Sequence, residues 1–307
     1  MKDKTLFSLL ITGITISWAT TQAWTGADHQ QMLRQARTRL PLEMRLLFSQ
    51  SGPSSLEEAW DRGAVKPDRE LHDYANHVWH VEPDARGRRY GKAPAKVESE
   101  VRLLSLRVNA GIPLKQLAED LGTASHYVAD INNPLHTATD PKEKRIHSRY
   151  ERNFERWGSK EWRFDGYDYH PTPAAWIKSA ARRSNQHYQE ILNSYQGEGF
   201  KKVAAVSAAC YDQGINDIVD LFYNVYLRSG SQLYRYPQLR LGGPQFNINT
   251  ATGEELSQIY YIDQRLANRL VRYRERHQGF RSLKETLNVK GMSRKRLQKI
   301  DFLLTLD

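Results

Sequence analysis

The feature that most constrains this chain is a set of metal-ligand residues placed around a proline at the end of an apolar helix pattern. His126 and Asp130 are four residues apart, so on a helix they project from one face and can share a metal ion. Pro134 cannot continue a helix interior, because its ring removes a backbone donor and clashes with the preceding turn. We therefore expect a kink near residues 132–133 that directs His136 towards a second metal ion.

A second pair repeats the four-residue spacing further along the chain. His147 and Glu151 are expected on another helix, where they supply an imidazole and a hard carboxylate. Such ligands without thiolate are typical of catalytic zinc sites, whereas structural zinc sites usually contain cysteine. The only cysteine is Cys210, which is expected to be buried, so a thiolate cage is excluded. The two pairs together predict a catalytic zinc centre.

The order and spacing of these ligands resemble those of the superfamily of bacterial zinc-dependent phospholipases C and single-strand-specific zinc nucleases. The resemblance covers about residues 24–228 and implies a mostly helical fold whose cleft holds three zinc ions. The Gly-x-x-x-Pro-Asp run at 63–68 and the His-Val-Trp run that begins at His77 resemble the phospholipase branch. His80 is an alternative to His77 as a ligand, and the Val-Trp pair that follows favours His77.

The same resemblance assigns nine residues to the three zinc ions. They are Asp68, His77, His126 and Asp130 for the first ion; His136, His147 and Glu151 for the second; and Trp24, His29 and a bridging Asp130 for the third. Trp24 would bind through its backbone amine and carbonyl. Asp68 would also orient the attacking water, which makes it the expected catalytic residue.

The first 23 residues have the pattern of a secretory signal peptide. Lys2 and Lys4 precede a largely apolar stretch, too short for a transmembrane span, that ends in small residues before Ala23. Cleavage after Ala23 would make Trp24 the first residue of the mature protein and supply the free amine that the third zinc needs. We therefore expect export to the periplasm or the extracellular space.

Helical periodicity dominates the remainder of the first 228 residues, and alternating strand patterns are scarce. Apolar residues recur at three- and four-residue spacing over residues 101–106, 114–131, 173–182 and 203–227. Residues 173–182 and 214–222 indicate packing rather than chemistry, because their apolar spacing already accounts for them. The pattern predicts an all-α bundle, and the resemblance implies that residues 24–228 form a phosphodiesterase domain.

The charge changes abruptly after this domain. Residues 228–307 contain 15 Lys and Arg against 7 Asp and Glu, a formal +8 of the chain's +10. Residues 229–244 include glycine- and serine-containing stretches and are expected to be a linker. Residues 245–307 resemble the tandem helix-hairpin-helix domain of competence DNA-receptor proteins. This second resemblance implies nucleic acid, with DNA expected, as the partner.

A helix-hairpin-helix turn binds phosphate because glycine lets the backbone approach closely and the amides that open the next helix point at the anion. The second hairpin combines such a turn with flanking cations, in Lys290, Gly291, Ser293, Arg294, Lys295 and Arg296. The first hairpin has Tyr261 and Asp263 where the family prefers glycine. A packing role is favoured over phosphate binding for this first hairpin.

Three functions are compatible with the sequence. The first is an exported zinc-dependent nuclease whose tail holds the nucleic acid. The second is a phospholipase C that acts on lipid headgroups, with the tail at a phospholipid membrane surface. The third is a non-catalytic DNA receptor, which the intact ligand set disfavours. We favour the nuclease, because a nucleic-acid-binding module raises the local concentration of a nucleic-acid substrate and does little for a lipid. No stable protein partner is implied.

Overall fold

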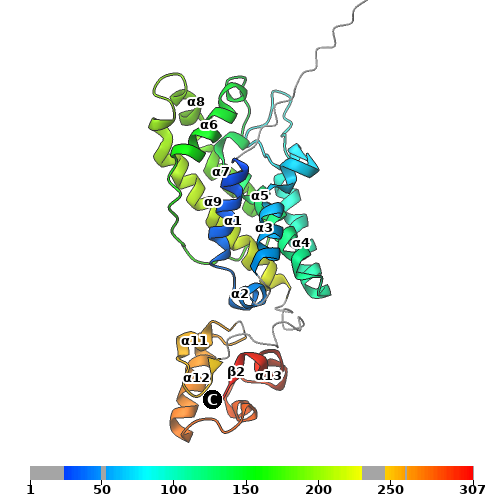
Figure 1. The fold of residues 1–307 in the computed structure, drawn as a ribbon, viewed down its shortest axis with the longest axis vertical. Helices are drawn as coiled ribbons and strands as arrows, with labels where there is room; N and C mark the ends of the chain where they lie inside the picture. Colours follow the sequence, from blue (N-terminus) through cyan, green and yellow to red (C-terminus); the bar gives the residue numbers. More distant parts are fainter. Residues whose placement is uncertain (1–23, 50–52, 230–245, 260, 307) are drawn as a thin grey trace, which may run out of the picture.

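The computed structural model describes residues 24–49, 53–229, 246–259 and 261–306. Up to residue 229 the described chain is a bundle of helices joined by loops and short turns, which confirms the predicted all-α class (Figure 1). Its elements are α1 (Gly26–Arg37), α2 (Leu42–Ser49), α3 (Pro53–Lys66), η1 (Pro67–Leu71), η2 (Tyr74–Asn76), α4 (Ala93–Ala110), α5 (Leu114–Ile131), η3 (Pro134–His136), α6 (Glu143–Trp157), α7 (Pro173–Asn185), α8 (Tyr188–Ser194) and α9 (Phe200–Arg228).

The predicted signal peptide at 1–23 and almost all of the predicted linker at 229–244 lie outside the described residues. Among the helices that are described, none is both long and apolar enough to cross a membrane.

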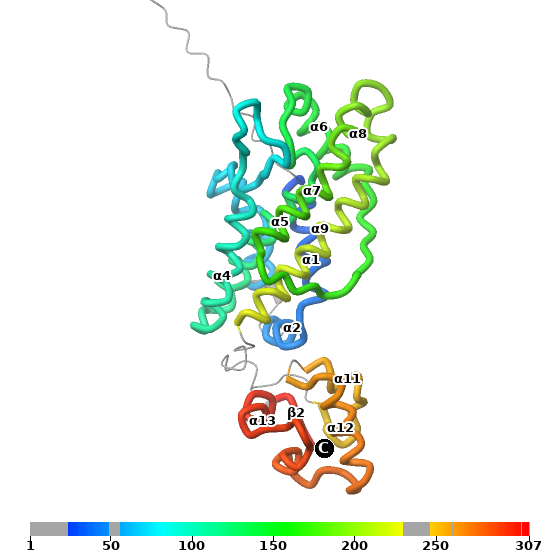
Figure 2. Tube along the Cα trace, turned by 180° about the vertical axis from the view of Figure 1, so that it is seen from behind, coloured from blue at the N-terminus to red at the C-terminus, as the bar shows by residue number. Residues whose placement is uncertain are grey.

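Helix α5 is the central element of the bundle (Figure 2). Every residue from Leu121 to Ile131 is buried, so this half of the helix is enclosed on all sides. The α5 helix ends at Ile131. Residues 132–133 are not helical, and the 3-10 turn η3 begins at Pro134. The expected kink before His136 is therefore confirmed. Because α5 is enclosed, the polar side chains of its last two turns must find partners inside the protein.

Helices α3 and α5 pack against each other through glycines. A Cβ atom added at Gly122 would lie 2.7 Å from the Trp60 carbonyl oxygen and 3.1 Å from the Ala64 amide nitrogen. A Cβ atom added at Gly63 would lie 2.2 Å from the Glu119 carbonyl oxygen. Contacts this close to backbone atoms leave room only for hydrogen. The two glycines therefore let the helices approach more closely than any other residue would allow.

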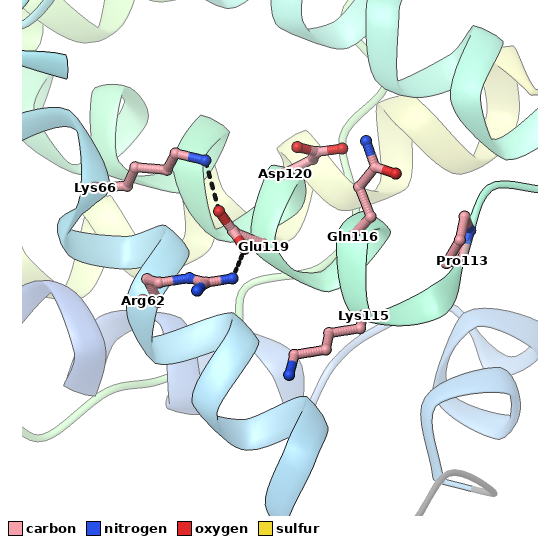
Figure 3. A pocket seen from close by; sticks show the side chains of 7 residues that line it. All are labelled: Arg62, Lys66, Pro113, Lys115, Gln116, Glu119 and Asp120. Carbon is pink, nitrogen blue, oxygen red and sulfur yellow. Dashed lines mark hydrogen bonds and ion pairs between the residues drawn. The ribbon is translucent and has the colours of Figure 1, made fainter. Parts of the chain in front are cut away.

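Ion pairs extend the same contact towards the surface. The Glu119 carboxylate of α5 lies between Arg62 and Lys66 of α3, with the Lys66 Nζ 2.5 Å from Oε1 (Figure 3). These side chains are partly exposed to solvent, so each pair contributes little stability. Their effect is to fix how α3 lies along α5, and this alignment sets where the residues after Lys66 enter the core.

An extended segment, residues 158–172, connects α6 to α7 and lies alongside α9 (Figures 1 and 2). Its backbone is bound by a row of polar α9 side chains one helical turn apart: Asp212, Asn216, Asp220, Asn224 and Arg228. For example, the Asn216 and Asn224 amides donate to the carbonyls of Arg163 and Asp168, each over 3.0 Å. An extended segment cannot satisfy its own backbone groups, so α9 satisfies them instead.

The C-terminal unit is small, and its first and last strands pair with each other. It contains β1 (Phe246–Asn247), α11 (Gly253–Ser257), α12 (Gln264–His277), η5 (Leu283–Asn288), α13 (Arg294–Ile300), η6 (Asp301–Leu303) and β2 (Leu304–Thr305). Strands β1 and β2 pair in parallel, with Phe246 opposite Leu304. The Arg274 guanidinium donates to the carbonyls of Ile248 and Ala251, which ties α12 to the segment after β1.

Two helical hairpins make up this unit, and their turns differ as the sequence indicates. In the second hairpin Gly291 has φ 103°, a conformation that favours glycine, and Ser293 caps α13. Tyr261 stands at the equivalent place in the first hairpin, and Lys299 donates to its hydroxyl over 3.0 Å. Asp263 caps α12 by accepting from the Leu266 amide. A negative charge thus lies beside the first amides of α12, where it would repel a phosphate, and this favours a packing role for the first hairpin.

The glycine contact between α3 and α5 yields a stability prediction. We expect Gly122→Ala to destabilise the protein by about 1–3 kcal/mol, because the added methyl group overpacks a rigid backbone contact. Gly197→Ala is the matched control, since its Cβ would meet nothing within 4 Å. Thermal unfolding followed by circular dichroism measures both variants. Equal melting temperatures for Gly122→Ala and the wild type would contradict the proposed contact.

Candidate metal centre

Side chains from six places in the bundle meet at one buried centre. They come from α1 (His29), the π-helical turn η1 (Asp68), the residue after η2 (His77), α5 (His126, Asp130), η3 (His136) and α6 (His147, Glu151). All eight are buried, and Asp130 has no exposed surface. Three groups within this set have ligand atoms close enough to hold one metal ion each. These groups are His29, Asp68 and His126; His77, His126 and Asp130; and His136, His147 and Glu151.

Asp130 lies at the middle of the first part of the centre. Its Oδ2 is 2.8 Å from His77 Nδ1 and 3.2 Å from His126 Nε2, and its Oδ1 is 3.2 Å from His29 Nε2. Asp68 stands further off, with its Oδ1 3.5 Å from His77 Nδ1 and 3.7 Å from His126 Nε2. One carboxylate thus faces three imidazoles with both of its oxygens, which is the geometry of a bridging ligand.

The second part of the centre is formed by η3 and α6. His147 Nε2 is 2.7 Å from Glu151 Oε1 and 3.3 Å from His136 Nε2. His147 and Glu151 are one turn apart on α6, as their spacing predicts, and Ile146, Tyr150 and Phe154 are also buried. The apolar face of α6 therefore fixes the orientation of both ligand candidates towards the centre.

Four of the histidines have an outer partner that orients the ring. The outer nitrogens of His126 and His136 donate to the carbonyls of Ala64 and His77, over 2.8 Å and 3.0 Å. The outer nitrogens of His77 and His147 instead contact carboxylates, those of Asp73 and Glu143. A histidine whose outer nitrogen carries the proton presents a lone pair on the inner nitrogen, which is how metal-binding histidines are held. These contacts place all four inner nitrogens in the centre.

Burial changes the acid-base properties of the second group. Burial raises the pKa of the Glu151 carboxyl to about 7, although the nearby His147 opposes the shift. Burial also lowers the pKa of His136 to about 3. For His147 burial favours the neutral ring, but the carboxylates of Glu151 and Glu143 outweigh it and raise the pKa to about 10. Burial disfavours the charged form of each group, and the neighbouring charges oppose or reinforce that effect.

Several polar atoms of the centre have no hydrogen-bond partner among the described residues. They are both oxygens of Asp130, Oδ1 of Asp68, Oε1 of Glu151 and both ring nitrogens of His29. Buried carboxylate oxygens without a donor are costly, because nothing replaces the water they lose on folding. A divalent cation would supply the missing partner for the oxygens of Asp130 and Glu151 and for one ring nitrogen of His29. The imidazole and carboxylate donors suit zinc, so the residues present fit this metal.

Two carboxylates that orient histidines of the centre were not predicted from the sequence. Asp73 lies four residues before His77, and Glu143 lies four residues before His147. The same spacing that identified His126 with Asp130 could have indicated Glu143, since α6 was an expected helix. Asp73 lies in a loop, where the spacing carries no such information.

Both His77 and Trp24 are found at or beside this centre. His77 belongs to the centre, whereas the His80 ring packs against Tyr90 at 5.2 Å between centroids. Between Asp68 and His77, the π-helical turn η1 ends at His72, whose backbone is left-handed with φ 49°. The buried Trp24 indole donates to the Ala129 carbonyl over 3.0 Å, so Trp24 lies beside the helix turn that bears Asp130.

The chain was compared with known proteins. The sequence model of the family described as zinc dependent phospholipase C matches residues 28–206, and that of the helix-hairpin-helix motif matches residues 243–305. No curated protein matches the chain.

Among solved structures, the chain resembles two toxins. The alpha-toxin of Clostridium perfringens avian strain SWCP has 18% identity over 66% of this chain and 64% of the toxin, with a TM-score of 0.43. The alpha toxin of Clostridium absonum has 13% identity over 68% of this chain and 61% of the toxin, with a TM-score of 0.41. The match thus spans less than two thirds of either toxin. The family model covers more than half of the chain, and on this ground the chain belongs to the zinc-dependent phospholipase C family of phosphoester hydrolases.

Proposed function

We propose that this protein is an exported zinc-dependent nuclease that hydrolyses phosphodiester bonds at the buried centre and holds its substrate with the helix-hairpin-helix unit. One observation carries the proposal: a zinc-type ligand cluster and a basic helix-hairpin-helix unit occur in the same chain. The cluster supplies phosphoester chemistry, and the unit supplies affinity for a polyanion.

The proposal places three zinc ions at the centre. The residues that would hold them are Asp68, His77, His126 and Asp130 for the first; His136, His147 and Glu151 for the second; and the Trp24 backbone, His29 and Asp130 for the third. When bound, zinc lowers the pKa of a coordinated water to roughly 7 and polarises the phosphoryl oxygens. The five imidazoles would hold the ions without adding negative charge, so that the loaded site would be positive enough to accept a phosphodiester.

Asp68 has the environment of a group that positions water. Its Oδ1 is buried, lacks a hydrogen-bond donor and lies further from the histidine nitrogens than either oxygen of Asp130 does. It can therefore accept a hydrogen bond from water and take the proton as the water oxygen adds to phosphorus and the ester oxygen leaves. Asp130 is enclosed by three imidazoles, so its role is to bridge metal ions rather than to move a proton.

The N-terminus forms part of the same proposal. Export with cleavage after Ala23 would expose the Trp24 amine as a ligand for the third zinc. The Trp24 side chain is already anchored near Asp130 by its contact with the Ala129 carbonyl and by the Phe154 ring, 4.7 Å between centroids. This anchoring supports the proposal, because it holds the first mature residue close to the bridging carboxylate.

The substrate choice depends on the C-terminal unit. Lys290, Arg294 and Arg296 surround a turn that Gly291 holds in a left-handed conformation, with Ser293 capping the following helix. Lys295 completes the predicted cationic set on α13. Cations around a close-approach turn attract phosphates without regard to sequence. Tethering nucleic acid in this way would raise its concentration near the metal centre.

A second candidate function is phospholipase C activity, which the matching family favours by its description. The two candidates are separated by assaying the zinc-loaded protein on single-stranded DNA, duplex DNA, RNA and phosphatidylcholine vesicles at the same enzyme concentration. We expect release of nucleotides from at least one nucleic acid and no release of phosphocholine. Phosphocholine release without nucleic-acid cleavage would reverse the assignment.

The bridging role of Asp130 can be tested by zinc analysis. We expect Asp130→Ala to lose at least one zinc ion and to lower turnover by more than the roughly 10- to 100-fold typical of outer-sphere partners. Asp120→Ala on the same helix is the control, because Asp120 pairs with Arg107 outside the centre. Metal content is measured by mass spectrometry beside kcat. Full zinc content in Asp130→Ala would rule out the bridging assignment.

The role of the Trp24 amine can be tested with two forms of the mature protein. One form begins at Trp24, and the other retains one additional alanine before it. We expect three zinc ions in the first form and two in the second, because the extra residue removes the amine from ligand distance. The same zinc content in both forms would show that the amine is not a ligand. Matching far-ultraviolet circular dichroism spectra would confirm that both forms are folded.

A further inference from the structure

A cationic hollow lies between α12 and the turn of the second hairpin. Its volume is about 230 Å³, and its charged lining consists of Arg269, Arg272 and Arg276 of α12 with Lys290 of the turn. The three arginines are three and four residues apart, so they share one face of the helix. We refer to this hollow as the α12 pocket.

The charges of the α12 pocket are unbalanced. Of the described residues that line it, none carries a carboxylate. The acidic residue within α12, Glu275, does not line it. Another arginine of the helix, Arg274, is used internally, where it donates to two backbone carbonyls. Several like charges around one hollow repel each other, and an anion relieves this repulsion.

A stack of aromatic rings forms another wall of the pocket. The Tyr273 ring lies between Phe280, 5.0 Å away at 12°, and His277, 4.0 Å away at 15°. Phe280 is buried, whereas His277 is exposed and lines the pocket together with Tyr273. The stack therefore ends in a flat ring whose outer face has no ring upon it among the described residues. Such a face can receive a nucleobase.

We propose that the α12 pocket binds one unpaired nucleotide of a nucleic-acid strand, with the phosphate against Arg269, Arg272 and Lys290 and the base against His277. The proposal rests on the proposed function, and it names the form of nucleic acid that the C-terminal unit selects. An open ring face suits an unpaired base, because the bases of a duplex are already stacked on one another and paired.

The position of the pocket gives a continuous path for the strand. Lys290 belongs both to the pocket and to the turn, and the Arg269 guanidinium lies next to Gly291, where an added Cβ would meet it at 2.7 Å. A strand whose phosphate lies at the Gly291 turn can thus place a neighbouring nucleotide in the pocket. The first hairpin is a poorer path, because the Asp263 carboxylate that caps α12 would repel a phosphate, whereas the Ser293 hydroxyl that caps α13 carries no charge.

The test uses the zinc-loaded full-length chain with phosphorothioate oligonucleotides, which resist cleavage, as a single strand and as a duplex. We expect Arg272→Gln to weaken single-strand binding and to lower the slope of log affinity against log salt by about 0.7, the contribution of one phosphate contact. Arg265→Gln is the matched control, since it removes the same charge from the same helix outside the pocket. Fluorescence anisotropy measures all three proteins.

The base contact is tested separately with His277→Ala. We expect about a fivefold or greater loss of single-strand affinity, the lower end for a stacked base, and no change for the duplex. Equal losses for single strand and duplex, or equal effects of Arg272→Gln and Arg265→Gln, would overturn the proposal. Binding to phosphatidylglycerol vesicles is measured in parallel. The proposal would also be overturned if Arg272→Gln weakened vesicle binding and left single-strand binding unchanged.

These outcomes are distinguishable from failure of the proposed function. If the protein cleaves nucleic acid but Arg272→Gln behaves like Arg265→Gln, the pocket assignment is wrong and the nuclease assignment stands. If it cleaves no nucleic acid but His277→Ala selectively weakens single-strand binding, the pocket stands and the nuclease assignment is wrong.

Discussion

The burial of Asp130 is the constraint on which the rest of the structure depends. An enclosed carboxylate costs several kcal/mol unless other groups replace its lost water. Here the inner nitrogens of imidazoles from α1, from the residue after η2 and from α5 itself surround the carboxylate, so that a divalent cation bound by them can replace that water. Each of those elements must therefore approach the same turn of α5. This requirement explains why residues 121–131 of α5 are enclosed on all sides while the last two turns carry polar side chains.

The packing of α3 follows from the same requirement. The Ala64 carbonyl accepts the outer proton of His126, and Asp68 enters the centre one turn later. Both positions are reached only if the two helices nearly touch, and Gly63 and Gly122 permit that approach. Glycine at these positions is thus a condition for the metal centre and not only for the fold. Stability and zinc binding are coupled through one contact, because a divalent ion favours the folded arrangement of its ligands.

How much could be predicted from the sequence depended on whether a residue's partner was local. The bounds of α5, its end before Pro134 and the pairing of His147 with Glu151 follow from spacing along one helix, and the structure has them. The contact of Asp73 with His77 could not be anticipated, because both lie in irregular chain whose path only the tertiary structure defines. The role of the α9 side chains that bind residues 158–172 could not be predicted for a related reason. Their four-residue spacing was visible, but their partners are backbone groups without a sequence signature.

The α12 pocket could not be predicted either, because its residues are distant from one another in the sequence. The arginines of α12 follow a helical spacing, but Lys290 joins them only because the second hairpin folds back on that helix. Charge counting alone treats the whole tail as one basic region with a formal +8. In the structure these cations have different places. Arg274 binds backbone carbonyls inside the unit, Lys290 and others surround the Gly291 turn, and the remaining arginines of α12 include those that line the α12 pocket. Exposed cations lose their attraction for phosphate as salt rises, whereas a stacked base is held by contacts that salt screens little. A tail that used both would retain a preference for unpaired strands under conditions in which attraction by charge alone has faded.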